Sequence, residues 1–167
     1  MSLPNPGPGL SNKDLIGLLK TLTCRGLSSA GVVIGTSSAA QVKWGSSIVV
    51  SINGKIVTVT TSEVAFTATT HDIAASASVV REAVYIVCCD AAGTVTLVKG
   101  EEASGSGTAV WPVAPTDKAV VGAVRVAVAA GTTPFDASTD LLSAGHITDT
   151  YYNVTCSPVD LGETLAA

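Results

Sequence analysis

The chain has 167 residues, of which 47% are hydrophobic, 13% are charged and only 4% are aromatic. This length fits one domain of ordinary size, and a composition rich in small residues and valine favours a β protein. Nine Lys and Arg against thirteen Asp and Glu give a net charge of −4 without a basic run. Nucleic-acid binding is therefore not expected, because neutralising phosphates requires clustered cations.

The apolar runs and the Met1 end indicate whether the protein is expected in a membrane or in a secretory compartment. No apolar run approaches the ~20 residues that a bilayer span requires, and the Met1 end lacks the basic and apolar regions of a secretion signal. We therefore expect a soluble protein made without such a signal, with no membrane partner. The charged share is about half of the ~25% usual in globular proteins, so part of the surface is expected to be buried against other protein. The alternative is a neutral surface rich in Ser and Thr.

Residues 1–29 are predicted to form an arm and a short amphipathic helix. Alternating Pro and Gly up to Gly9 favour extended backbone, and Ser11 then has the properties of a helix N-cap. The apolar residues that follow at helical spacing, or pack as a hydrophobic staple, are Leu10, Leu15, Ile16, Leu18, Leu19 and Leu22. This face either docks on its own domain or binds a partner.

Two hairpins are expected in the middle of the chain. In the first, apolar residues alternate from Ile48 to Ile52, Asn53-Gly54 forms a two-residue turn, and the chain returns through Lys55 to Thr60. Shorter β pieces are expected at 32–34 and 41–43.

The second hairpin is the centre of the predicted fold. Its first arm, Val84 to Cys89, is apolar at every position, which is typical of a buried central strand. Asp90 to Gly93 supply turn chemistry, and the return arm to Lys99 alternates polar and apolar residues. Either a second sheet or a neighbouring subunit must cover the first arm.

The rest of the chain contains a long loop, two strands and a tail. The loop runs from Gly100 to Lys118, and its Trp111 either anchors an interface or packs on its own domain. Ala119 to Ala129 is a strand whose faces carry Val120, Val124, Val126 and Val128 on one side and Val121, Ala123 and Ala127 on the other. Ile147 to Val154 is the last strand. Trp111 and Phe135, large apolar side chains in loops, are the hypothetical subunit-interface residues.

Residues that could support chemistry are few and scattered. The two histidines, His71 and His146, lie in polar stretches without a clustered carboxylate or a second His at metal-binding spacing. The four cysteines have no C-x-x-C spacing, and the adjacent Cys88 and Cys89 point to opposite faces, so they are predicted to be small buried apolar residues. We expect no enzyme activity, no catalytic residue, no metal, no cofactor and no small-molecule substrate.

Five stretches of turn and strand sequence follow one another in a characteristic order. They are I-N-G-K at 52–55, D-A-A-G-T-V at 90–95, V-W-P-V-A-P at 110–115, K-A-V-V-G-A-V-R-V at 118–126 and G-T-T-P-F-D-A-S-T-D-L-L at 131–142. In this ordered set, over Gly31 to Val154, the chain resembles tailed-phage capsid decoration (cement) proteins and the related head-fibre proteins.

The resemblance implies a virion structural protein with a compact β domain, usually a homotrimer, on the exterior of an icosahedral capsid. Its partner would be the major capsid protein, and it would be synthesised in the host cytoplasm. The short arm, without a fibre repeat, favours cement over fibre. The alternative is a head-fibre or receptor- or glycan-binding β-sandwich of a virion.

The expected fold is mainly β. It is a compact antiparallel β-sandwich or barrel-like domain over residues 30–156, with a short N-terminal helix and arm over 1–29 and a C-terminal tail over 157–167. The leucine-rich helix is the hypothetical capsid-binding element.

Overall fold

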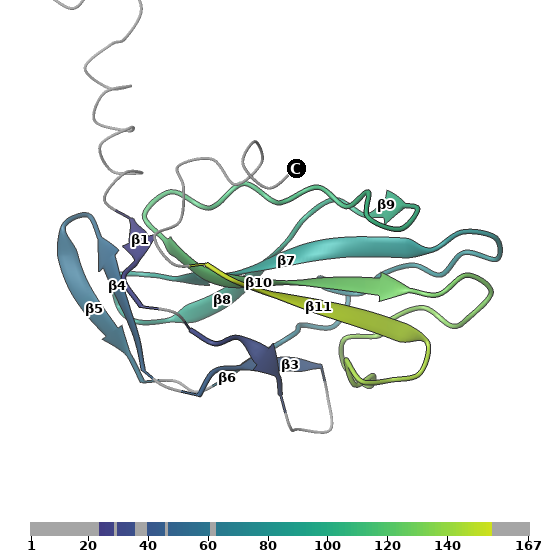
Figure 1. Ribbon diagram of the computed structural model, residues 1–167, viewed down its shortest axis with the longest axis horizontal. Helices are drawn as coiled ribbons and strands as arrows, with labels where there is room; N and C mark the ends of the chain where they lie inside the picture. Colours follow the sequence, from purple (N-terminus) through teal and green to yellow (C-terminus); the bar gives the residue numbers. More distant parts are fainter. Residues whose placement is uncertain (1–23, 29, 36–39, 46, 61–62, 155–167) are drawn as a thin grey trace, which may run out of the picture.

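The computed structural model describes residues 24–28, 30–35, 40–45, 47–60 and 63–154 (Figure 1). Within these ranges the secondary structure is entirely β. The predicted leucine-rich helix and the C-terminal tail lie outside the described residues. In the described part of the chain, no helix has the length and hydrophobicity needed to cross a membrane.

The largest sheet forms the centre of the molecule. Its strand order is β11-β10-β7-β8, all antiparallel, and the short β9 pairs with the start of β7. The strands are β7 (Arg81–Cys89), β8 (Val95–Lys99), β9 (Ala103–Ser104), β10 (Ala119–Val128) and β11 (Ile147–Asn153).

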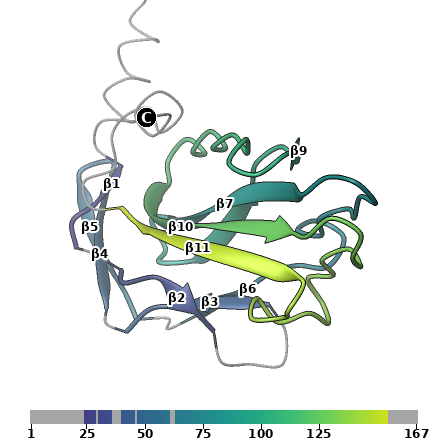
Figure 2. The same ribbon diagram turned by 45° about the vertical axis from the view of Figure 1, so that its right-hand side comes forward.

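Two smaller antiparallel sheets accompany it. One has the order β1-β4-β5 and the other β2-β3-β6. Their strands are β1 (Arg25–Gly26), β2 (Val33–Ile34), β3 (Gln41–Lys43), β4 (Ile48–Ile52), β5 (Lys55–Val59) and β6 (Glu63–Ala65). Figures 1 and 2 show β3 and β6 along one side of the central sheet and the β4-β5 hairpin at one end of it. The fold is thus sandwich-like, as predicted, and among the described strands no sheet closes into a barrel.

Both predicted hairpins are present, with the predicted turns. Asn53 and Gly54 have φ of 52° and 79°, the paired positive values of a two-residue turn whose twist matches its strands. At the second turn, the Asp90 carboxylate accepts hydrogen bonds from the Ala92 and Thr94 amides at 2.9 Å, and Gly93 has a φ of 85°. The β structure begins earlier than the predicted boundary at residue 30, because Arg25–Gly26 pairs with β4.

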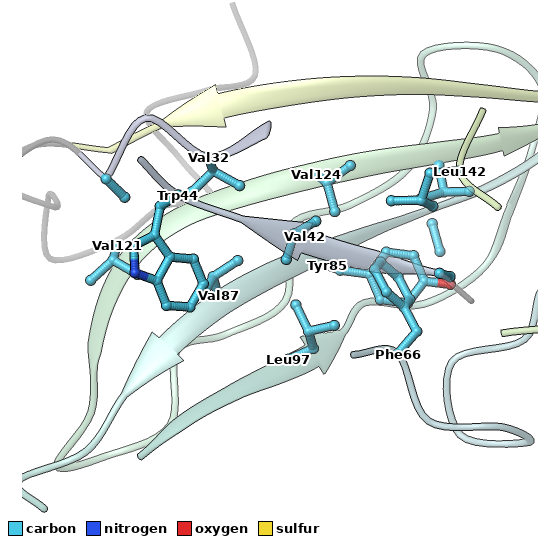
Figure 3. Packing of buried hydrophobic residues seen from close by; sticks show 14 of the residues in the cluster. Val32, Val42, Trp44, Phe66, Tyr85, Val87, Leu97, Val121, Val124 and Leu142 are labelled. Carbon is cyan, nitrogen blue, oxygen red and sulfur yellow. The ribbon is translucent and has the colours of Figure 1, made fainter. Parts of the chain in front are cut away.

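The main core lies between the central sheet and the two smaller sheets (Figure 3). Tyr85 and Val87 of β7 face Val42 of β3, and the Tyr85 ring meets Phe66 edge-on at 4.8 Å between centroids. One face of the central strand is therefore covered by a second layer of sheet, which was one of the two predicted alternatives.

The other face of β7 has a smaller apolar cluster of its own. Its buried members are Val84, Ile86, Cys88, Val120 and Ala123. Packed against them are Val98, Ala109, Trp111 and Tyr152. Ala109 and Trp111 belong to the loop that follows β9, so this chain itself covers both faces of its central strand. The strand that is apolar on both sides therefore gives no support to a neighbouring subunit as the cover.

One detail of β10 differs from the predicted alternation. The pairing with β7 shifts by one residue between Val120 and Gly122, which makes Val121 the extra residue of a β-bulge. As a result Val121 joins Val124 in the main core, and Val120 joins Ala123 on the opposite face. The prediction that Val120 shares a face with Val124 was wrong, because the bulge reverses the alternation between them.

Phe135 occupies a different place from the one predicted. Its side chain is 0% exposed, and it packs edge-on against Phe66 at 5.8 Å between ring centroids. Its backbone forms an isolated bridge with Ile73, which ties the loop before β11 to the loop before β7. Because the ring lies wholly in the core of its own chain, it offers no surface to another subunit.

Candidate functional site

His71 is a core residue. It is 6% exposed, its Nδ1 accepts a hydrogen bond from the Thr67 amide at 2.7 Å, and its backbone carbonyl accepts one from the Tyr85 hydroxyl. Burial lowers the pKa of His71 below its ordinary value of 6.5, outweighing a hydrogen bond with the Leu97 backbone that raises it. The histidine is therefore held neutral, with its Nδ1 already occupied.

This histidine predicts a pH dependence of stability. Below pH 6.5 the unfolded chain takes up a proton at His71 that the folded protein resists, so stability falls as the pH drops through this range. The slope that one such group contributes is at most about 1.4 kcal/mol per pH unit. Urea denaturation between about pH 5 and 6.5 should show it in the wild type and lose it in His71→Asn, whose side-chain oxygen can still accept the Thr67 amide. Equal slopes in both proteins would contradict the prediction.

Glu102 joins two cations at the edge of a surface pocket. Its carboxylate oxygens lie 3.0 Å from Arg81 Nη2 and 2.8 Å from Lys99 Nζ, and Lys99 also donates to the Asp72 carbonyl. Burial raises the pKa of Glu102, but hydrogen bonds from Lys99 and Arg81 outweigh this and hold it below its ordinary value. The pocket is lined by Thr70, His71, Arg81, Leu97, Val98, Lys99, Gly100, Glu101 and Glu102. Both cations of the pocket therefore already pair with Glu102.

Within the part of the chain that the structure describes, the remaining titratable groups do not assemble into a chemical site. Among the described residues, no three His, Cys, Asp or Glu side chains lie close enough to hold a metal ion. His146 Nε2 lies 3.7 Å from Asp140 Oδ2, which also accepts a hydrogen bond from the Asp136 amide at 2.8 Å. Cys88 and Cys89 are buried free thiols, as predicted, and burial raises their pKa to about 12 and about 11.

A different kind of surface is formed by residues 105–115, which we call the strap. The strap connects β9 to β10 and runs along the face of the central sheet opposite to β3 and β6 (Figures 1 and 2). The sequence from Ala103 to Thr116 contains no charged residue. Two of its valines point into solvent, since Val110 is 63% exposed and Val113 is 90% exposed.

A buried carboxylate holds the strap on the sheet. Glu82 of β7 is 0% exposed, and its Oε1 accepts hydrogen bonds from the backbone amides of Thr108 and, at 2.7 Å, Ala109. Its Oε2 lies 3.8 Å from Nε of Arg125, the only charge of β10. A charged acceptor of this kind binds backbone amides more strongly than a neutral one.

Aromatic packing and a glycine complete the contact. Trp111 is half-buried and meets Tyr152 of β11 edge-on at 5.1 Å between ring centroids. At Gly100 the strap approaches so closely that an added Cβ would lie 2.6 Å from the Val110 carbonyl oxygen. In this position the strap presents its exposed valines to solvent, which suits them for contact with another protein.

The sequence and the structure agree only partly on the site residues. The hypothetical capsid-binding leucines lie outside the described residues. Trp111 packs on its own domain through part of its surface, and its role in a subunit interface stays a prediction. Glu82 was missed, although a charge directly before an apolar run was a visible signal.

Comparisons with known proteins identify no relative. No protein-family model, no curated protein and no solved structure matches the chain.

Proposed function

We propose that this chain is a virion structural protein, a capsid decoration protein that binds the outer surface of a capsid and stabilises the shell. The observation that carries the proposal is the strap, an uncharged segment with exposed valines on a rigid β domain. Exposed apolar groups flanking a half-buried Trp are typical of a protein-docking surface. The resemblance of the chain to decoration proteins motivates the choice of the capsid as partner.

The proposed mechanism is stabilisation by linkage. A protein that binds the assembled lattice and not its free subunits shifts the equilibrium toward the lattice by mass action. Such a function requires no catalytic residue and no cofactor. It requires a stable scaffold and an apolar surface, and the β domain with its strap supplies both.

The docking role of the strap can be tested by substitution. Val110→Ser and Val113→Ser together should lower decoration of capsids at least tenfold, measured by cosedimentation with particles that lack the protein. Because both side chains are mostly solvent-exposed, thermal stability should change little. Ile56→Ser on β5 is the matched control, since Ile56 is 67% exposed on a different sheet. Normal decoration by the double variant would remove the strap from the binding surface.

The leucine-rich segment is the alternative attachment. If it binds the capsid, Leu15→Ser, Leu18→Ser and Leu22→Ser together should leave a folded protein that no longer decorates particles. Normal decoration by this triple variant, together with loss in the strap variant, would assign attachment to the strap. Full decoration by both variants would contradict the proposed function as argued here.

The oligomeric state is a further prediction. The low share of charged residues favours a homotrimer, in which three weak contacts act together on the lattice through a high effective concentration. Light scattering of the isolated protein should give about three chains per particle, with about 800 Å² or more buried per partner. A monomer at micromolar concentration would contradict the trimer and leave the docking role of the strap open to the test above.

A further inference from the structure

The strap covers a part of the molecule that is separate from the main core. Beneath it lies the second apolar cluster, which includes Val84, Ile86 and Cys88 on one face of β7. Cys89, one residue further along, points into the main core on the other face. Uncovering the second cluster would therefore leave the main core intact.

The strap is attached by few hydrogen bonds. At its first residue, the Gly105 amide donates to the carbonyl of Val80, directly before β7, at 2.8 Å, but among the described residues, residues 106–114 form no backbone hydrogen bond with the backbone of the sheet. Their polar contacts with the sheet are the two amides bound by Glu82 and a 3.3 Å hydrogen bond from the Thr108 hydroxyl to the Ser104 carbonyl of β9. The remaining contact is packing, chiefly that of half-buried Trp111 on Tyr152. Segments held by few hydrogen bonds are among the least stable units of a fold and can open by themselves. Strands that are hydrogen-bonded to one another in a sheet open together.

The closed position also leaves charged groups incompletely bonded. Glu82 Oε2 and Arg125 Nε are buried and have no hydrogen-bond partner in the described structure, and the 3.8 Å between them is too long for a good hydrogen bond. Water can bind both groups once the strap is lifted. This gain offsets part of the free energy that is lost when the two amide bonds and the Trp111 packing are broken.

We propose that the strap is a hinged cover that opens as a local unit while the sheets stay folded, and that Glu82 holds it closed. Gly105 and Gly107, with φ of 111° and 77°, provide backbone freedom at the end next to β9. In the open state the apolar outer face of β7 and β10 becomes accessible. The protein thus has a second apolar surface, covered in the ground state. This inference is independent of the capsid as partner.

The two adjacent cysteines allow a direct test. Each is 0% exposed in the closed protein, and they lie beneath different layers. The test measures the rate at which iodoacetamide modifies each thiol, followed by mass spectrometry. Cys89→Ala retains Cys88 and reports its rate, whereas Cys88→Ala retains Cys89 and reports that one. The Cys88→Ala/Cys89→Ala double variant gives the background from Cys24 and Cys156. If the strap opens locally, Cys88 should react at least tenfold faster than Cys89, with a weak dependence on urea.

The role of Glu82 in holding the strap closed is tested by substitution in the same assay. Glu82→Gln retains an oxygen for the amides but loses the charge, so Cys88 should react about tenfold faster again, with the Cys89 rate changed less. Gly100→Ala, which places a methyl against the Val110 carbonyl, should act in the same direction. Gly45→Ala is the matched control, because an added Cβ at Gly45 has no neighbour within 4 Å.

Two results would overturn the inference. Equal rates for Cys88 and Cys89 in the two single variants, with the same steep urea dependence, would mean that both thiols react only through global unfolding. An unchanged Cys88 rate in Glu82→Gln would show that Glu82 does not hold the strap closed. If Glu82→Gln unfolds, both thiols become fully reactive, and the comparison without this substitution still decides whether the strap opens.

Discussion

Replacing Phe135 by Ala should lower the free energy of unfolding by about 3 to 5 kcal/mol, the largest loss that we expect from a single substitution in this chain. The ring is 0% exposed and sits in the main core beside Phe66. Truncation removes its buried apolar surface and leaves a cavity that the neighbouring strands can fill only in part. Urea denaturation followed by tryptophan fluorescence measures the change, since Trp44 lies in the same core.

The control for Phe135→Ala is a truncation at the surface. Val113→Ala removes apolar atoms from a side chain that is 90% exposed and should change stability by less than about 0.5 kcal/mol. A loss below about 1 kcal/mol for Phe135→Ala would contradict its core position. Light scattering of the same variant distinguishes a core role from a subunit-interface role. Loss of a core residue lowers stability, whereas loss of an interface residue lowers the number of chains per particle.

Gly122→Ala should cost about 1 to 3 kcal/mol through steric overlap. A Cβ added at Gly122 would lie 2.5 Å from Val32 Cγ2 and 3.2 Å from the Tyr152 carbonyl oxygen. Neither neighbour can yield easily, since Val32 is 1% exposed and Tyr152 belongs to the adjacent strand. The glycine therefore lets the segment before β2 pack closely on β10, directly after the bulge at Val121.

A double-mutant cycle identifies the cause of the Gly122 effect. Val32→Ala removes the nearest obstacle, so the combined variant should lose less stability than the sum of the two single variants. Gly45→Ala is again the neutral control, because open space surrounds that position. Strict additivity would show that the added methyl does not meet Val32, and would contradict the close approach.

The strands and turns of this chain were largely predictable from sequence, because both depend on local chemistry. Alternation with a period of two marks Ile48 to Ile52, and Asn53-Gly54 can adopt the positive φ values of its turn. An uninterrupted apolar run marks β7 as central, and the same run predicted that both of its faces would be covered.

Tertiary structure alone decided what covers the two faces of β7 and which residues are buried there. A one-residue bulge in β10 moved Val120 and Val121 to opposite sides, which no periodicity in the strand reveals. Phe135 in a loop became a core residue, because its backbone pairs with Ile73 in the loop before β7, which is distant in sequence. Glu82 acquired its role only when the strap folded back to bring two amides within hydrogen-bonding distance of its carboxylate. In each case the deciding contact joins segments far apart in the chain, so its energy depends on the assembled fold and not on the residues beside it in the sequence.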